Sequence, residues 1–167
     1  MSFWFFVKLL HIFAGVFWMG AAFITIFFVL PAVRAAGPAG GAVMKQLTNE
    51  QKLPLYINVA AALTTLCGIL LYWRLTGGFT PVFSSALPWT GLMIGSLSGI
   101  MAFLWGFFIQ SRNAKRLGML TAGIQGPPTP EQAAAIANLQ RRLHIGGLVG
   151  IVFLVISLTG MVMSHPM

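Results

Sequence analysis

The chain has 167 residues, of which 57% are hydrophobic and only 7% are charged. A soluble domain has about a quarter of its residues charged, so this composition excludes one. The net charge of +8 does not indicate nucleic-acid binding, because the basic residues lie between apolar runs and form no single patch. The single cysteine excludes a disulfide framework. The composition predicts an integral membrane protein whose first partner is the lipid bilayer.

Four apolar runs are long enough to cross a bilayer, which takes about 20 residues. The first run is too long for a signal peptide, and no polar cleavage region follows it, so we expect it to stay as a helix. The runs predict an all-α fold, an integral membrane four-helix bundle in a single transmembrane domain over residues 1–167. The predicted helices lie at about 3–31, 54–73, 88–111 and 130–163.

Polar residues and prolines mark the helix starts on the basic side. Thr129 precedes Pro130, and Gln132 follows three residues after Thr129, which is the pattern of a capping box with proline at the first helical position. The fourth helix is therefore expected to begin in water and to continue into the membrane. Thr48 predicts a similar cap before the second helix.

Glycines recur four residues apart in the third apolar run, at Gly91, Gly95 and Gly99, and the fourth run contains Gly146 and Gly150. Small residues at this spacing line one face of a helix and allow backbones to approach closely. The pattern predicts tight helix packing. It also permits a flat cofactor or a homodimer, and the sequence does not decide between these.

Lysine and arginine are concentrated in two of the three connections. The first holds Arg34, Lys45 and Lys52, the third holds Arg112, Lys115, Arg116, Arg141 and Arg142, and the middle one holds Arg74 alone. Connections rich in Lys and Arg stay in the cytoplasm. We therefore expect both termini on the outer, periplasmic side of a bacterial-type inner membrane.

Lys8 and His11 share one face of the first helix, which Gly15 and Trp18 continue. Lys8 can extend to the outer interface, but His11 lies about one turn deeper. One explanation is a hydrogen bond from His11 to a hydroxyl or carbonyl of another helix. A ligand role is favoured, because an ionisable residue in a membrane helix marks function by default. Histidine followed by glycine on one face suits haem, with the imidazole on iron and room for the porphyrin.

The opening segment resembles the first helix of the HemJ-type protoporphyrinogen oxidases and of their relatives in the copper-resistance CopD group. Their pattern is close to W-x-x-x-K-x-L-H-I-x-x-x-x-x-W-M, and the resemblance covers about the first thirty residues. The matching residues are Trp4, Lys8, Leu10, His11, Ile12, Trp18 and Met19.

The resemblance implies that His11 is a ligand of haem b. HemJ-type proteins also use a lysine in a later helix, and the second to fourth apolar runs of this chain contain none. The resemblance therefore points to haem binding more directly than to protoporphyrinogen oxidation.

The end of the fourth helix places Met161, Met163 and His165 on the same side of the membrane as His11. If this helix packs beside the first, any of the three is a candidate for the second axial ligand. Thioether and imidazole together also suit Cu(I), with His11 and His165 as metal ligands. The alternative is a frayed terminus with no ligand role.

His144 follows two arginines and is expected near the cytoplasmic face, most of a ~30 Å hydrocarbon thickness from His11. This separation excludes one haem iron held by both histidines of one chain. We expect Asn58, Gln110 and His144 at similar depth, as a hydrogen-bonded cluster joining three helices. His144 is a secondary candidate for a second haem or a proton path.

The leading interpretation is a haem b membrane protein with a redox role, exchanging electrons with a quinol or a redox partner protein, or reacting with a small oxidant or gas. Copper handling of the CopD type, a HemJ-like oxidase and a structural subunit without cofactor stay as alternatives. The sequence therefore does not decide whether the chain is an enzyme. No carboxylate lies in an apolar run, which argues against paired-carboxylate catalysis and against a carrier that uses acidic residues.

Overall fold

The computed structural model describes residues 2–79, 87–124, 126 and 128–164. Its α-helices and three π-helical segments, η1 to η3, follow one another along the chain. They are α1 (Phe3–Ile24), η1 (Thr25–Val29), α2 (Leu30–Ala35), α3 (Pro38–Lys45), η2 (Gln46–Glu50), α4 (Leu53–Thr76), α5 (Leu87–Leu104), η3 (Trp105–Gln110), α6 (Ser111–Ala122) and α7 (Pro130–Met163).

Four helices are long and apolar enough to cross a membrane. They span Phe3–Ala35, Leu53–Thr76, Trp89–Ala122 and Pro130–Met163, because α1, η1 and α2 form one rod and α5, η3 and α6 form another. The predicted all-α fold with four membrane-spanning helices is confirmed, and the chain is a multi-pass membrane protein. The first and third rods continue past the predicted ends at 31 and 111, since hydropathy marks the end of an apolar run and not the end of a helix.

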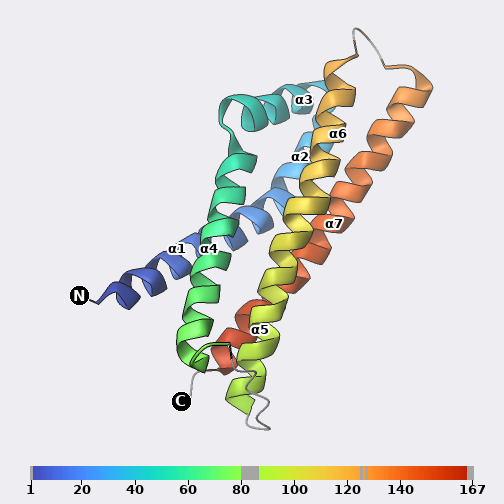
Figure 1. Ribbon diagram of the computed structural model, residues 1–167. Coiled ribbons are helices and arrows are strands. Elements are labelled where there is room, and N and C mark those ends of the chain that lie inside the picture. Colours follow the sequence, from blue (N-terminus) through green and yellow to red (C-terminus); the bar gives the residue numbers. More distant parts are fainter. Residues whose placement is uncertain (1, 80–86, 125, 127, 165–167) are drawn as a thin grey trace.

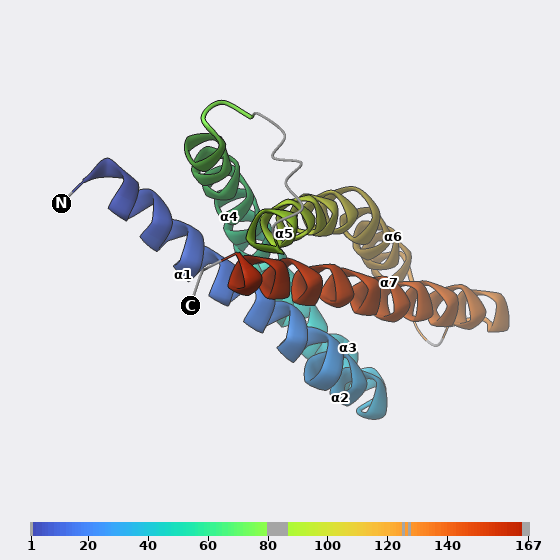
Figure 2. The same ribbon diagram turned by 90° about the horizontal axis from the view of Figure 1, so that it is seen from below.

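Two antiparallel pairs, α1 with α4 and α5 with α7, make most of the contacts between the long helices. Figures 1 and 2 show α7 running beside the α5–α6 rod, while α1 crosses α4. In Figure 1, α3 and the connection before α7 lie at one end of the molecule, and the end of α4 lies at the other.

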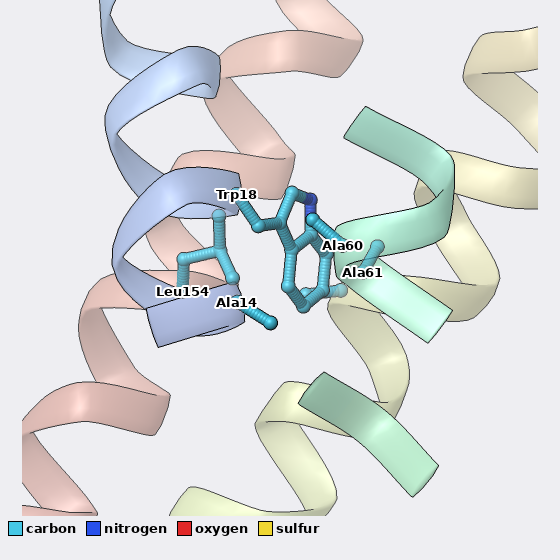
Figure 3. Close-up of a cluster of buried hydrophobic side chains, with 6 residues drawn as sticks. Ala14, Trp18, Ala60, Ala61 and Leu154 are labelled. Atoms are coloured by element: carbon cyan, nitrogen blue, oxygen red, sulfur yellow. The ribbon is translucent and has the colours of Figure 1, made fainter. Parts of the chain in front are cut away.

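The buried centre is small and brings four helices together. It contains Ala14, Trp18, Ala60, Ala61, Ala102 and Leu154. Figure 3 shows the Trp18 ring reaching from α1 towards the two alanines of α4. The outward side of α1 is apolar as well, with Phe13 67% exposed and Val16 68% exposed. Such a surface suits hydrocarbon and not water.

The predicted tight packing of the third apolar run is confirmed. A Cβ at Gly95 would lie 2.9 Å from the carbonyl oxygen of Ser157, and one at Gly91 would lie 3.0 Å from that of Gly160. The Ser98 hydroxyl also donates to the carbonyl oxygen of Phe153 at 2.8 Å. The α5 and α7 backbones therefore approach as closely as glycine allows.

Of the two predicted caps, one is present. The Thr129 hydroxyl accepts from the Gln132 N–H and the Gln132 side chain accepts from the Thr129 N–H, so α7 begins with a capping box. The cap expected at Thr48 is wrong, because its hydroxyl donates backwards to the carbonyl oxygen of Met44 at 2.9 Å. Helix α4 begins only after Lys52, whose backbone is left-handed at φ 51°.

Candidate functional site

His11 lies in the contact between α1 and α4. Its Nδ1 is 2.8 Å from the backbone carbonyl oxygen of Thr64. Further along the same pair, Trp18 packs with Ala60 and Ala61, and Trp4 stacks with Arg74. These contacts step along the two helices in opposite directions, so the antiparallel α1–α4 pair sets where the imidazole lies.

The bond to Thr64 fixes the tautomer of a neutral His11. A carbonyl oxygen only accepts, so the proton is on Nδ1 and Nε2 keeps its lone pair. Among the described residues, this is the one hydrogen bond that His11 makes. The half-exposed ring therefore offers a free basic nitrogen, held in orientation by a backbone group as in ligating histidines.

Two glycines flank the His11–Thr64 contact. At Gly68, one turn beyond Thr64, an added Cβ would lie 3.0 Å from His11 Cε1 and 3.3 Å from Nδ1, so its absence makes room for the imidazole. At Gly15 an added Cβ would lie 3.5 Å from Thr64 Cγ2, an ordinary contact. Gly15 therefore faces α4, next to the His11–Thr64 contact.

Two cations lie between His11 and the end of the molecule where α1 begins and α4 ends. Lys8 is exposed one turn before it on α1, and Arg74 is exposed near the end of α4. The Arg74 guanidinium carbon is 4.6 Å from the ring centre of Trp4, a cation–π contact that holds α1 and α4 together at this end. Neither cation is in an ion pair with any of the described residues, so both can bind an anion.

Trp18, predicted to contact the cofactor, is buried in the four-helix centre with 8% of its surface exposed. Ala60 and Ala61 of α4 and Leu154 of α7 pack around it (Figure 3). Trp18 therefore fixes where α1 sits on α4 and α7, about two turns inward from His11.

The structure does not bring the methionines of α7 against His11. Met163 lines a groove of about 430 Å³ between α5 and α7, together with Thr90, Gly91 and Thr159. The Met161 backbone N is 3.1 Å from where a Cβ of Gly95 would lie. Met161 is two turns outward from Leu154 on the face of α7 that meets α1. His165, the other predicted ligand, lies outside the described residues.

In the other half of the molecule, the prediction that Asn58, Gln110 and His144 form a hydrogen-bonded cluster is wrong. The Gln110 amide donates to the backbone carbonyl oxygen of Leu143 at 2.9 Å, and not to a side chain. Gln110 Oε1 and His144 Nδ1 are both buried without a hydrogen-bond partner in the described part of the chain. The Leu143 carbonyl oxygen, one residue before His144, accepts the hydrogen bond of the Gln110 amide, so Gln110 and His144 are not hydrogen-bonded to each other.

Sequence reasoning did not identify Thr64 and Gly68 as neighbours of His11, or Arg74 as the partner of Trp4. The spacing of Thr64 and Gly68, four residues apart, was a signal that they share a helix face. Arg74 was the lone basic residue of its connection. Nothing local to α1 indicates which face of α4 it meets, so these contacts become visible only in the fold.

Across the residues that the structure describes, no three His, Cys, Asp or Glu side chains come close enough to hold a metal ion together. A ligand at His11 would therefore be held through one imidazole and non-acidic neighbours. A scan against protein-family models finds no match, and neither curated proteins nor solved structures give one.

Proposed function

We propose that the chain is a haem b-binding membrane protein with a redox role, in which His11 is an axial ligand. The observation that carries this proposal is the 2.8 Å hydrogen bond from His11 Nδ1 to the Thr64 carbonyl oxygen. It leaves Nε2 with its lone pair and orients the ring, as a backbone carbonyl does for metal-ligating histidines. The resemblance of the first helix to HemJ-type and CopD-type proteins supports the same residue.

The residues around His11 fit a haem in two respects. Gly68 leaves room for the imidazole. Lys8 and Arg74 are unpaired cations outward of the ring, suited to bind the two propionates. When bound, haem would supply one-electron redox chemistry. Met161, Met163 and His165 stay candidates for the second axial ligand.

The same proposal includes an orientation. Eight of the ten Lys and Arg residues lie towards the end that holds α3 and the connection before α7, and Lys8 and Arg74 are the other two. By the excess of Lys and Arg, that end faces the cytoplasm. Both termini and His11 then belong to the outer side of a bacterial-type inner membrane, where a quinol or a redox partner protein would exchange electrons.

Haem content after expression with ample haem tests the proposal. We expect close to one haem per chain, lost in His11→Ala and kept in His144→Ala, the matched control. Equal loss in both variants would indicate a general folding defect, and retention in both would contradict the ligand role of His11. A chain that binds copper through His11 and no haem would favour the copper-handling alternative. Oxidation of protoporphyrinogen would favour the HemJ-like one.

A further inference from the structure

Basic residues gather at one end of the described helices without acidic partners. All Lys and Arg residues except Lys8 and Arg74 belong to the elements of this end. Both carboxylates of the chain, Glu50 and Glu131, also belong to it. Eight cations against two anions leave most of the positive charge uncompensated by the protein.

Two hydrogen bonds bring four of these arginines to one level. Arg34 Nη2 donates to the carbonyl oxygen of Gln140 at 2.6 Å, which ties α2 to α7. Gln110 Nε2 donates to the carbonyl oxygen of Leu143, which ties η3 to α7. Arg112 lies two residues beyond Gln110, and Arg141 and Arg142 lie between the two carbonyl groups. Each step along a helix is about 1.5 Å, so the four guanidinium groups start from nearly the same level. We name Arg34, Arg112, Arg141 and Arg142 the arginine belt.

The belt has no internal counter-charge. All four side chains are exposed, and none is in an ion pair with a residue in the described ranges. Glu131 lies ten residues before Arg141, on the order of 15 Å along α7, in the first turn, where the helix dipole favours it. Arg34 uses one of its N–H groups on Gln140 and keeps the others. The four guanidinium groups of the belt are therefore open to external anions.

The depth of the belt identifies the anion. Next to the belt, towards the middle of the long helices, the surface is apolar, with Phe108 57% exposed on η3 and Ile145 48% exposed on α7. A lipid whose acyl chains lie against these side chains has its phosphate at the level of the arginines. A soluble anion would have no use for the apolar surface next to the charges.

We propose that the arginine belt binds the headgroup of an anionic phospholipid, with the guanidinium groups on the phosphate oxygens and the acyl chains along η3 and α7. Arginine binds phosphate through two parallel hydrogen bonds, and basic clusters at the ends of membrane helices recognise anionic headgroups. This site is at the opposite end of the helices from His11 and does not depend on haem.

Native mass spectrometry of the full chain in detergent tests the proposal, with phosphatidylglycerol and phosphatidylcholine as probes. The variant is Arg112→Gln/Arg141→Gln, which spares the Arg34–Gln140 hydrogen bond. Its matched control is Lys45→Gln/Lys52→Gln, which removes the same charge at the same end but off the belt. Since one basic residue contributes about a factor of five to binding at a charged surface, we expect the belt variant to lose at least about tenfold in affinity for phosphatidylglycerol.

The control should keep the wild-type preference for phosphatidylglycerol over phosphatidylcholine, and so should His11→Ala. Equal loss in the belt variant and the control would overturn the belt as a site, because bulk charge would then suffice. Binding of glycerol phosphate as tight as that of the lipid would overturn the lipid assignment. If the belt variant does not fold, the salt dependence of lipid binding to the wild type replaces it as the test. A higher salt concentration should weaken the binding of phosphatidylglycerol more than that of phosphatidylcholine. An equal response of the two lipids would refute the proposal.

Discussion

His11 and His144 lie in the two halves of the molecule, and their surroundings differ in one respect that matters. The Nδ1 of His11 has a backbone partner, Thr64, at 2.8 Å. The Nδ1 of His144 is buried with no hydrogen-bond partner among the described residues. A backbone carbonyl fixes both the tautomer and the orientation of an imidazole. A membrane histidine is thus a better ligand candidate when its second nitrogen is already held.

The two helix pairs, α5 with α7 and α1 with α4, differ in what their glycines make room for. Between α5 and α7, glycines bring backbones together, and the added Cβ atoms would meet backbone atoms. Between α1 and α4, Gly68 instead makes room for a side chain, the His11 ring. Glycine spacing predicts the packing of α5 and α7, but only the α1–α4 pair uses the space beside a glycine for a group with chemistry. The predictions below separate the two uses, from the largest expected effect to the smallest.

Gly68→Val should break the His11 site. The new Cβ would lie 3.0 Å from His11 Cε1, and the two further methyl groups must displace the ring. We expect haem affinity to fall by at least about tenfold, because ligand-orienting contacts are worth 10- to 100-fold. The measurement is haem titration of the purified apoprotein. Gly20→Val is the matched control, since a Cβ there meets nothing within 4 Å. Unchanged haem affinity in Gly68→Val would show that the ring position does not matter.

Gly95→Val should damage the other pair and leave the His11 site in place. Its Cβ would lie 2.9 Å from the Ser157 carbonyl oxygen and 3.1 Å from the Met161 N, which are backbone atoms that cannot move alone. Overpacking of this kind costs about 1–3 kcal/mol in the free energy of unfolding. Thermal unfolding in detergent would measure it, against Gly106→Val, where an added Cβ meets nothing within 4 Å. Equal stability of the two variants would contradict the close α5–α7 approach.

Lys8→Met and Arg74→Gln should each lower the reduction potential of a haem at His11, since a nearby cation favours the reduced iron. At a separation of about 10 Å and an effective dielectric constant between about 20 and 80, Coulomb's law gives a shift of some tens of millivolts. A potentiometric titration measures it, with Lys45→Met at the other end as control. No shift in either variant would remove both residues from the site.

Gln110→Leu is expected to change least. It removes the hydrogen bond to the Leu143 carbonyl oxygen, worth on the order of 1 kcal/mol, but also removes the buried Oε1 that has no partner. We expect the free energy of unfolding to stay within about 1 kcal/mol of the wild type and haem content to stay the same. A loss above about 3 kcal/mol would mean that Gln110 holds a larger polar network.

The sequence predicts the features that depend on neighbours along the chain. Hydropathy gives the four helices, the Thr129–Gln132 spacing gives the cap of α7, and the glycine spacing gives a packing face on α5. It does not predict contacts between helices. The partner of His11 is 53 residues away and is a backbone carbonyl, which no residue type signals. The Thr48 cap failed for a related reason, since a hydroxyl can bond backwards as well as forwards.

The absorption spectrum of the purified protein, oxidised and then reduced with dithionite, tests the central claim most directly. We predict a Soret band and, on reduction, resolved α and β bands of a low-spin haem b, absent from His11→Ala and present in His144→Ala. Broad bands that respond to carbon monoxide would place an open iron position beside His11, in line with reaction with a small oxidant or gas. A colourless protein after expression with ample haem, or an unchanged spectrum in His11→Ala, would contradict His11 as a haem ligand.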